Sequence, residues 1–351
     1  MWLVPALRFP EFSGEWDEYA IGEILSIGNG RDYKHLHNGD IPVFGTGGYM
    51  TSVDDFLYDG ESVFVGRKGT INKPLYYNGK FWTVDTLFYT YNFTDVLPKF
   101  VYCLFQTINW LKYNEASGVP SLSKATIEKI KVRIPSMDEQ DKLSNLLFLL
   151  DKRIEVQNNI IEKLETLIKG IRHKVFKQLR KDFGFNSTIG DILSFEQPQR
   201  YIVSSAEYSN DDTFIPVLTA NKAFILGYTT ETDGIYDKGD CIIIDDFTLD
   251  CKYVSFPFKV KSSAIKILTA NNKFILRYTY EYLKSLELST EEHKRHYITE
   301  IQPYSCVLPD ENTLKTIALV FENLAYKLSN EQSLALILNK QRQYLLSKMF
   351  I

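Results

Sequence analysis

Two loops in the first half of the chain combine glycine with cationic and hydroxyl side chains. One is Gly45-Thr46-Gly47-Gly48 followed by Tyr49, and the other is Gly66-Arg67-Lys68-Gly69-Thr70. Glycine lets backbone amides approach an anion closely, arginine can pair bidentately with guanine, and lysine contacts phosphate. We therefore expect both loops to contact DNA. The candidate residues are Thr46, Gly47, Gly48, Tyr49, Arg67, Lys68 and Thr70.

The second half of the chain offers a comparable pair of loops. They are Thr219-Ala220-Asn221-Lys222 and Asp245-Asp246-Phe247-Thr248. Asparagine can read adenine, and aspartate can accept a hydrogen bond from cytosine. A plain turn explains any single loop equally well, but the doubled set favours DNA. The candidate residues are Thr219, Asn221, Lys222, Asp245, Asp246 and Thr248, and none is assigned to a base.

The sequence shows no convincing catalytic motif. It lacks the Asn-Pro-Pro-aromatic and Asp-Pro-Pro-aromatic motifs of amino methylation, a P-loop, and a Gly-x-Gly-x-x-Gly after a strand. The one Pro-Asp pair, Pro309-Asp310, follows Glu292-His293-Lys294, which is the wrong order for a nuclease. Asp245-Asp246 could hold a divalent metal, but no third acid is placed beside it, so a turn or a DNA contact is favoured. We expect no catalytic residues, no metal and no cofactor.

The histidines and cysteines suggest no metal site. His35 and His37 lie in one polar stretch, and His293 and His296 lie in another, so surface loops explain both pairs. His173 lies among lysines and arginines, where a helix-dipole role and a phosphate contact are equally good explanations. The four cysteines are scattered without metal spacing. A reduced cytoplasmic protein is the simplest interpretation.

Charge alone neither supports nor excludes nucleic-acid binding. The net charge is −4, and the acid is concentrated in residues 1–133, with 13 Lys+Arg against 15 Asp+Glu, and in residues 181–306, with 13 against 18. Residues 134–180 carry 9 basic residues against 7 acidic ones. A local basic face would suffice for DNA. No stretch approaches the roughly 18 apolar residues of a membrane helix, and the N-terminus has no signal-peptide core.

Two long helical segments must position these loops. Residues 135–176 and 309–350 correspond at a constant shift of 174 (309 − 135 = 350 − 176 = 174). Each opens at a proline and then repeats apolar residues at steps of three and four, as in the face of a coiled coil. The first series is Leu143, Leu147, Leu150, Ile154, Ile161, Leu164, Ile168, Ile171 and Val175. A helix of about 40 residues would be roughly 60 Å long.

The repeat extends beyond these segments. Ile21-Gly22-Glu23-Ile24 reappears as Ile189-Gly190-Asp191-Ile192, and Ile41-Pro42-Val43 reappears as Ile215-Pro216-Val217. Between them lie short β-rich runs separated by Gly, Asn and Asp turns, followed by an aromatic helical stretch. We predict an α+β fold with largely antiparallel sheets. Its four segments are 1–134, 135–181, 182–308 and 309–351.

The order of domain, long helix, domain, long helix favours antiparallel helices that form a coiled coil. The two globular domains would then lie at opposite ends, related by a pseudo-twofold axis. Gln157 and Glu331 replace apolar residues at equivalent positions. They either fix the register of the pair or are unrelated polar residues that face solvent.

This layout resembles the specificity subunit of type I restriction–modification systems. The opening Leu7 to Phe12 followed by Glu15-Trp16 is similar to that family, as are three motifs in the first half and the start of the first long helix. These motifs are Phe44 to Tyr49, Val65 to Gly69 and Ser117 to Leu122. The similarity covers nearly the whole chain. One departure is that no glutamine follows Glu311 at the start of the second long helix.

The resemblance implies two target-recognition domains and no catalysis by the chain itself. Such a subunit binds double-stranded DNA at a bipartite, asymmetric target, and it holds modification (methyltransferase) subunits and restriction subunits. A helix of roughly 60 Å corresponds to about 18 base pairs, which bounds the separation of the half-sites. The alternatives are a stand-alone DNA-modifying or DNA-cleaving enzyme fragment and an adaptor that binds protein only.

Overall fold

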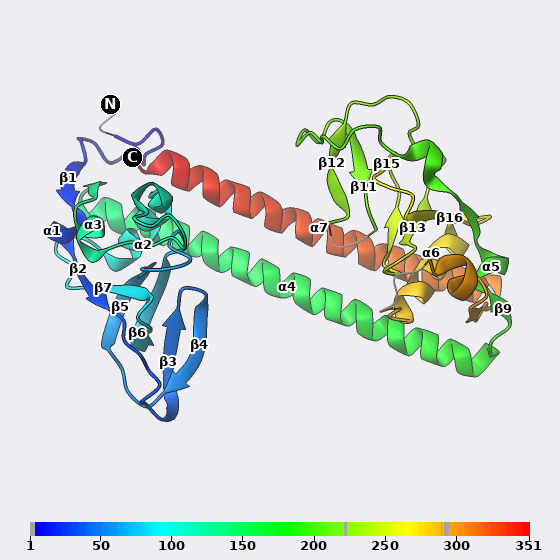
Figure 1. The fold of residues 1–351 in the computed structure, drawn as a ribbon, viewed down its shortest axis with the longest axis horizontal. Helices are drawn as coiled ribbons and strands as arrows, with labels where there is room; N and C mark the ends of the chain where they lie inside the picture. The colour runs from blue at the N-terminus through cyan, green and yellow to red at the C-terminus, as the bar shows by residue number, and fades with distance from the viewer. Residues whose placement is uncertain (1–3, 221–222, 289, 291–294) are drawn as a thin grey trace. The chain divides into compact units, whose positions relative to one another are not determined.

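The chain forms two structural units in the computed structural model, which describes residues 4–220, 223–288, 290 and 295–351 (Figure 1). Unit 1 comprises residues 1–158 and 333–351, and unit 2 comprises residues 159–332. Each unit therefore contains part of both long helices, α4 (Met137–Phe183) and α7 (Glu311–Met349). Helices and strands alternate along the chain, so the fold is mixed α and β, as predicted.

Unit 1 contains eight strands and three further short helices before α4, within its described residues. A short 3-10 helix, η1 (Trp110–Tyr113), follows α2. The elements are β1 (Asp17–Ala20), α1 (Ile21–Ile24), β2 (Ser26–Asn29), β3 (Asn38–Gly45), β4 (Gly48–Val53), β5 (Tyr58–Gly66), β6 (Leu75–Thr83), β7 (Leu87–Tyr91), α2 (Pro98–Thr107), α3 (Lys124–Glu128) and β8 (Lys131–Ile134).

Unit 2 repeats this order with shorter strands. Its elements are β9 (Ser187–Thr188), α5 (Ile189–Ile192), β10 (Ser194–Glu196), η2 (Pro198–Tyr201), β11 (Ile215–Leu218), β12 (Ile225–Thr229), β13 (Cys241–Asp245), β14 (Cys251–Val254), β15 (Lys259–Val260), β16 (Ile265–Thr269), α6 (Lys273–Ser285), η3 (Tyr297–Ile301) and β17 (Ser305–Cys306). The repeated motifs fall on equivalent elements, since Ile21 and Ile189 open α1 and α5.

The sheet of unit 1 has the order β2-β7-β5-β6-β3-β4. Its pairings are antiparallel except between β3 and β6, where Val43 lies opposite Trp82. Gly60 and Gly79 face each other across β5 and β6, and their φ angles are +143° and +125°. Residues with side chains rarely adopt such angles. Glycine at both positions therefore lets β5 and β6 pair with this backbone conformation. Phe44, Phe64 and Phe81 lie in one small core of the same sheet.

Unit 2 divides the equivalent sheet into two. One has the order β10-β16-β13-β14 and the other β12-β11-β15, with β11 and β15 parallel. The strand that corresponds to β6 is interrupted between β14 and β15, where Pro257 cannot donate a backbone hydrogen bond. The prediction of largely antiparallel sheets is confirmed in both units.

The charges at the ends of α4 explain where this helix begins and ends. Asp138 and Glu139 occupy its first turn and Arg180 and Lys181 its last, which complements the helix dipole. The Gln140 side chain accepts a hydrogen bond from the backbone N–H of Leu97 at 2.9 Å and donates to the Pro135 carbonyl at 3.0 Å. These bonds fix the start of α4 to the rest of unit 1.

Inside each unit, parts of the two long helices share a hydrophobic core with the globular elements. In unit 2, Gln332 Nε2 donates to Glu165 Oε1 at 3.3 Å, and the rings of Phe176 and Phe321 stack 6.5 Å apart. Glu165 of α4 contacts Gln332 of α7, and Phe176, further along α4, contacts Phe321, which comes earlier in α7. The two helices therefore run antiparallel in this unit. In unit 1, Leu143, Leu147 and Met349 lie in the same core.

Candidate nucleic-acid interface

Unit 1 brings its two predicted loops together. Thr46 and Gly47 form the turn between β3 and β4, and Gly48 has a φ of +105°. A Cβ atom added to Gly69 would lie 3.7 Å from Thr46 Oγ1, so this turn lies beside the loop that follows β5. Figure 1 shows the β3–β4 hairpin, which forms one edge of the sheet, at the end of the unit away from α2 and α3. Tyr49 is 64% exposed at its tip.

The loop after β5 is held by backbone hydrogen bonds to two other loops. The Arg67 N–H donates to the Thr86 carbonyl at 2.8 Å, and the Gly69 N–H donates to the Pro120 carbonyl at 2.8 Å. Gly66 has to be glycine, because a Cβ atom would lie 2.2 Å from the Thr70 carbonyl oxygen. Arg67 and Lys68 are exposed, whereas Thr70 is half-buried.

A groove of about 560 Å³ lies beside this loop. Its lining includes Asn29, Arg67, Lys68, Val119 and Lys124. The segment Asn114 to Leu122, which closes one side, did not figure among the predicted site residues. The Ser117 to Leu122 motif, noted only for the family resemblance, was the signal that could have identified it. Unit 1 thus presents glycine turns, three cations and an exposed tyrosine on neighbouring loops.

The predicted DNA-contact residues of unit 2 include both buried and exposed side chains. Thr219 is buried, and its N–H donates to the Phe224 carbonyl at 2.8 Å. Asp245 is also buried, and its carboxylate accepts hydrogen bonds from the backbone N–H groups of Phe247 and Thr248 at 2.9 and 3.0 Å. Thr248 is exposed. Asn221 and Lys222 lie outside the described residues, as does His293.

Asp246 is engaged inside unit 2 and is only 1% exposed. One carboxylate oxygen accepts from the N–H groups of His296 and Tyr297 at 3.1 and 2.8 Å, and the other lies 3.1 Å from Lys266 Nζ. The carboxylate therefore fixes the turn after β13 against the start of η3. The prediction that His296 lies in a surface loop is wrong: it is 1% exposed, and its Nδ1 lies 2.9 Å from Glu300.

The exposed residues near this turn include two that sequence reasoning missed. Arg295 lies with its guanidinium carbon 5.9 Å from the centre of the Phe247 ring, and its Nη2 lies 3.4 Å from Ser263 Oγ. Lys261 is exposed on the neighbouring loop, and its N–H donates to the Leu218 carbonyl at 3.1 Å. The Asp246 N–H donates to the Ala264 carbonyl at 2.7 Å. The loop 261–264 therefore connects the segment that contains Thr219 with the turn that contains Asp246.

The remaining candidates for chemistry lie apart from these loops. Burial raises the pKa of the Cys103 thiol to about 12, so a reactive thiolate is disfavoured. His35 and His37 are exposed in the loop before β3. The described residues contain no group of three or more His, Cys, Asp or Glu side chains that could hold a metal ion. No helix in the described part of the chain has both the length and the apolar character needed to cross a bilayer.

Comparison with known proteins gives these features a context. Residues 13–166 match the family described as the type I restriction modification DNA specificity domain. The chain is 44% identical over 141 residues to the EcoR124I/EcoR124II specificity subunit of Escherichia coli, covering 38% of this chain and 35% of that protein. It is 26% identical over 126 residues to the MjaVIII specificity subunit of Methanocaldococcus jannaschii, covering 34% and 27%. The matches thus span between about a quarter and about a third of the length of these relatives.

Two solved structures share the fold. The S subunit of a type I restriction–modification system from M. genitalium aligns with a TM-score of 0.76 and 17% identity, over 99% of both chains. A chain from a structure of a type I restriction–modification system aligns with a TM-score of 0.52 and 14% identity, over 95% of this chain and 97% of that one. The resemblance to the specificity subunits of type I restriction–modification systems is thereby confirmed, and residues 13–166 are the part of the chain that is similar to the DNA specificity domain of that family.

Proposed function

We propose that this chain is the non-catalytic, sequence-specific DNA-recognition subunit of a type I restriction–modification complex. The observation that carries the proposal is the specificity domain over residues 13–166, within which the Thr46 turn, the Arg67 loop and the segment 114–122 meet. Glycine turns beside exposed cations suit phosphate contacts, and Arg67 suits a guanine edge. Thr46, Gly47, Gly48, Tyr49, Lys68 and Thr70 would complete this contact surface.

The second recognition domain would read the other half of a bipartite, asymmetric target. Its contact residues would be Asn221, Lys222 and Thr248, joined by Lys261 and Arg295, and the buried Thr219 would support them from inside. Asp245 and Asp246 would position the turn from inside, because their carboxylates accept hydrogen bonds from its backbone and from η3. Since the loops of the two units differ in sequence, their half-sites should differ too.

The four segments 1–134, 135–181, 182–308 and 309–351 would then be two target-recognition domains and two conserved helices. We infer that α4 and α7 pair as an antiparallel coiled coil, which would relate the domains by a pseudo-twofold axis and fix the spacing of the half-sites. The antiparallel run of the helices within unit 2 supports this inference. Gln157 and Glu331 would set the register of the pair.

Each unit carries exposed apolar residues on both long helices, which suits partner subunits. Residues seven apart lie on one face of a helix. Unit 1 exposes Leu149 and Val156 on α4 and Ile337 and Tyr344 on α7, and unit 2 exposes Ile160 and Leu167 on α4 and Leu319 and Tyr326 on α7. Two such surfaces would dock two modification (methyltransferase) subunits, with restriction subunits joining that core.

Chemistry on DNA would be performed by these partners, in the cytoplasm. Methyl transfer to an adenine requires flipping the base into a pocket, and that pocket would belong to a modification subunit. The competing function is a stand-alone DNA-modifying or DNA-cleaving enzyme. A purified chain that methylates or cleaves DNA without partners would establish that alternative.

Exchange of the recognition domains tests the proposal. Residues 1–134 are replaced with the equivalent segment of a relative, and the methylated sites of the host genome are sequenced. One half-site should change while the other stays, because each domain reads its own half. The matched exchange of residues 182–308 should change the opposite half-site. A change in both halves from either exchange, or methylation that is independent of this gene, would contradict the proposal.

A further inference from the structure

A basic groove lies in unit 2 between the exposed side of α4 and the C-terminal end of α6. Its volume is about 690 Å³, and we define it by its charged lining residues: Lys169, Arg172, His173, Lys174, Arg180, Lys284 and Glu287. Five lysines and arginines and one histidine thus face a single carboxylate in this lining. The sequence leaves two explanations for His173, a helix-dipole role and a phosphate contact, and its place in this groove is compatible with the phosphate contact.

Two of these cations are already neutralised. Lys169 Nζ lies 2.6 Å from Glu287, and Arg172 Nη2 lies 2.7 Å from the buried Glu281. Lys174, Arg180 and Lys284 form no ion pair with any carboxylate among the described residues. The groove therefore carries an excess of positive charge that nothing in its lining balances. Such an excess attracts an anion.

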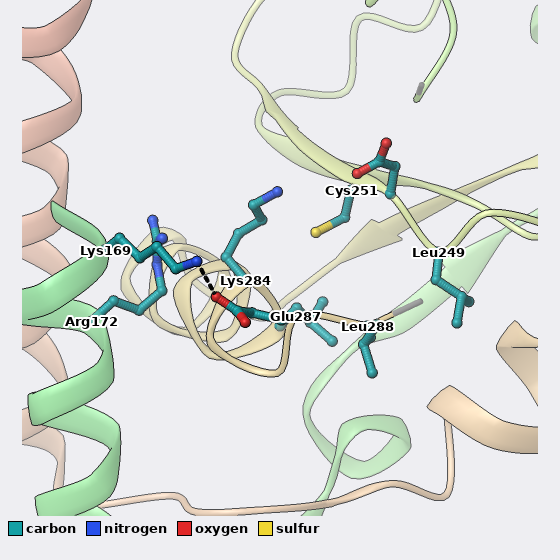
Figure 2. A pocket seen from close by; sticks show the side chains of 9 residues that line it. Lys169, Arg172, Leu249, Cys251, Lys284, Glu287 and Leu288 are labelled. Carbon is teal, nitrogen blue, oxygen red and sulfur yellow. Dashed lines mark ion pairs between the residues drawn. The ribbon is translucent and has the colours of Figure 1, made fainter. Parts of the chain in front are cut away.

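The groove continues to the candidate DNA-binding turn of the same unit. A neighbouring cavity of about 370 Å³ shares Lys169, Arg172, Lys284 and Glu287 with it. This cavity is also lined by Leu249, Asp250 and Cys251, which directly follow Thr248. Figure 2 shows Leu249 and Cys251 across the cavity from Lys169 and Arg172 of α4, with Lys284 between the two sides. The positive surface thus begins where the proposed recognition turn ends.

The spacing of the cations suits a nucleic-acid backbone better than a single anion. From Lys169 to Arg180 is about 16 Å along the helix at 1.5 Å per residue. Phosphates on one strand of duplex DNA advance about 3.4 Å per base pair along the axis, so this distance corresponds to about five of them. A cavity for one free phosphate would instead need its cations to converge on one point.

The corresponding positions in unit 1 lack this charge. At the shift of 174 that relates the long helices, Lys169, Arg172, His173 and Lys174 correspond to Gln343, Leu346, Ser347 and Lys348. Of these four positions, unit 1 has one cationic residue, Lys348, whereas unit 2 has three lysines and arginines and a histidine. The basic groove is therefore a property of one half of the chain and not of the repeated architecture.

We propose that the basic groove binds backbone phosphates of the DNA next to the half-site that unit 2 reads. This inference rests on the proposed DNA-recognition function and adds a contact that carries no base information. Lys174 and Lys284 would each neutralise a phosphate, with Arg180 and His173 nearby. The contact would strengthen binding to any sequence and leave the identity of the half-sites unchanged.

The salt dependence of DNA binding tests the groove directly. The full chain is titrated with a DNA duplex that carries its methylation target, at several salt concentrations. Each phosphate neutralised by a cation contributes about 0.9 to the slope of log K against log salt. The double variant Lys174→Gln/Lys284→Gln should therefore lower that slope by about 2, and Lys174→Arg/Lys284→Arg should retain it.

The control removes the same charge from elsewhere on the long helices. Lys163 and Lys327 are exposed and do not line the groove, so Lys163→Gln/Lys327→Gln should leave the slope near that of the unaltered chain. The proposal is overturned if the slope of log K against log salt falls no more in Lys174→Gln/Lys284→Gln than in this control variant. A changed half-site in methylome sequencing of the groove variant also overturns it.

Failure of the proposed function would give a different result. If the unaltered chain shows no salt-dependent affinity for the duplex, DNA recognition itself is refuted and the groove proposal falls with it. A second possible result is that the unaltered chain binds DNA while the groove variant Lys174→Gln/Lys284→Gln keeps the same salt slope as the control variant. In that case DNA recognition stands and the groove proposal alone is refuted. Thermal unfolding of each variant, with an unchanged midpoint, excludes misfolding as the cause.

Discussion

Single buried carboxylates hold the elements of unit 2 together. Glu281 of α6 is 1% exposed and lies between two arginines, with Arg172 Nη2 on one oxygen at 2.7 Å and Arg277 Nη2 on the other at 2.7 Å. Arg277 also donates to the Phe321 carbonyl of α7 at 3.1 Å. Glu281 thus links α6 to α4, and its partner Arg277 links α6 to α7.

Loss of the Glu281 charge should destabilise unit 2. The variant Glu281→Gln leaves two partly buried arginines without a counter-charge. Breaking a buried pair costs about 3 to 5 kcal/mol, and the lower end applies because both arginines keep some access to water. We expect the free energy of unfolding, measured by urea titration, to fall by about 3 kcal/mol.

The matched control is Glu287→Gln, which removes a carboxylate from the exposed pair with Lys169. Exposed pairs contribute little to stability because water and salt screen them. This variant should unfold at the same urea concentration as the unaltered chain. Equal destabilisation by the two variants would show that the position of Glu281 between the arginines has no special importance.

At the scale of the elements, equivalent strands differ between the two units. In unit 1, β5 and β6 stay continuous, and the facing glycines Gly60 and Gly79 adopt positive φ angles. In unit 2 the counterpart of β6 is divided into β14 and β15, with Pro257 between them. Local backbone chemistry therefore decides whether a unit has one sheet or two.

Replacing Gly79 tests the importance of its positive φ angle in unit 1. A side chain at a φ of +125° is strained whatever the free space around it. We expect Gly79→Ala to lower the free energy of unfolding by about 2 kcal/mol and to weaken DNA binding, since β6 leads to the segment 83–86 that supports the Arg67 loop. Calorimetry and the duplex titration measure the two effects.

Gly118 provides the matched control for Gly79. It lies in the segment 114–122 with open space around its Cα, and its φ is not in the left-handed region. Gly118→Ala should therefore leave the thermal midpoint unchanged. A loss of stability as large as that of Gly79→Ala would mean that the loss of any glycine destabilises the unit, whatever its φ angle.

At the scale of the whole molecule, the proposed function depends on a fixed separation of the two recognition domains. Seven residues inserted into each of α4 and α7 would keep the heptad pattern and add about 10 Å. At about 3.4 Å per base pair, the spacer between the half-sites should grow by about three base pairs. Methylome sequencing measures the new spacer, and both half-sites should be unchanged.

An insertion of seven residues into α4 alone serves as the control for this experiment. It breaks the match between the two helices, and we expect it to abolish methylation instead of lengthening the spacer. An unchanged spacer after the double insertion would refute the proposal that the helices measure the distance. The exchange of residues 1–134 tests the separate proposal that each domain reads its own half-site.

The sequence by itself determined the elements and their order. The steps of three and four from Leu143 to Val175 reflect the helical period, and they all lie inside α4. The motifs at Ile21 and Ile189 predicted equivalent short helices in the two halves. These features follow from local periodicity and turn chemistry, which a sequence displays directly.

Only the tertiary structure decided which polar residues are buried and which loops meet. The sequence predicts surface positions for Asp246 and His296, but both are buried. Asp246 contacts Lys266 and Tyr297, and the His296 N–H donates to Asp246, which is 50 residues away in the sequence. The meeting of Thr46 with Gly69, and of Lys174 with Lys284 in the basic groove, likewise joins separate segments. Burial and ion pairing depend on contacts distant in sequence, which no local pattern contains.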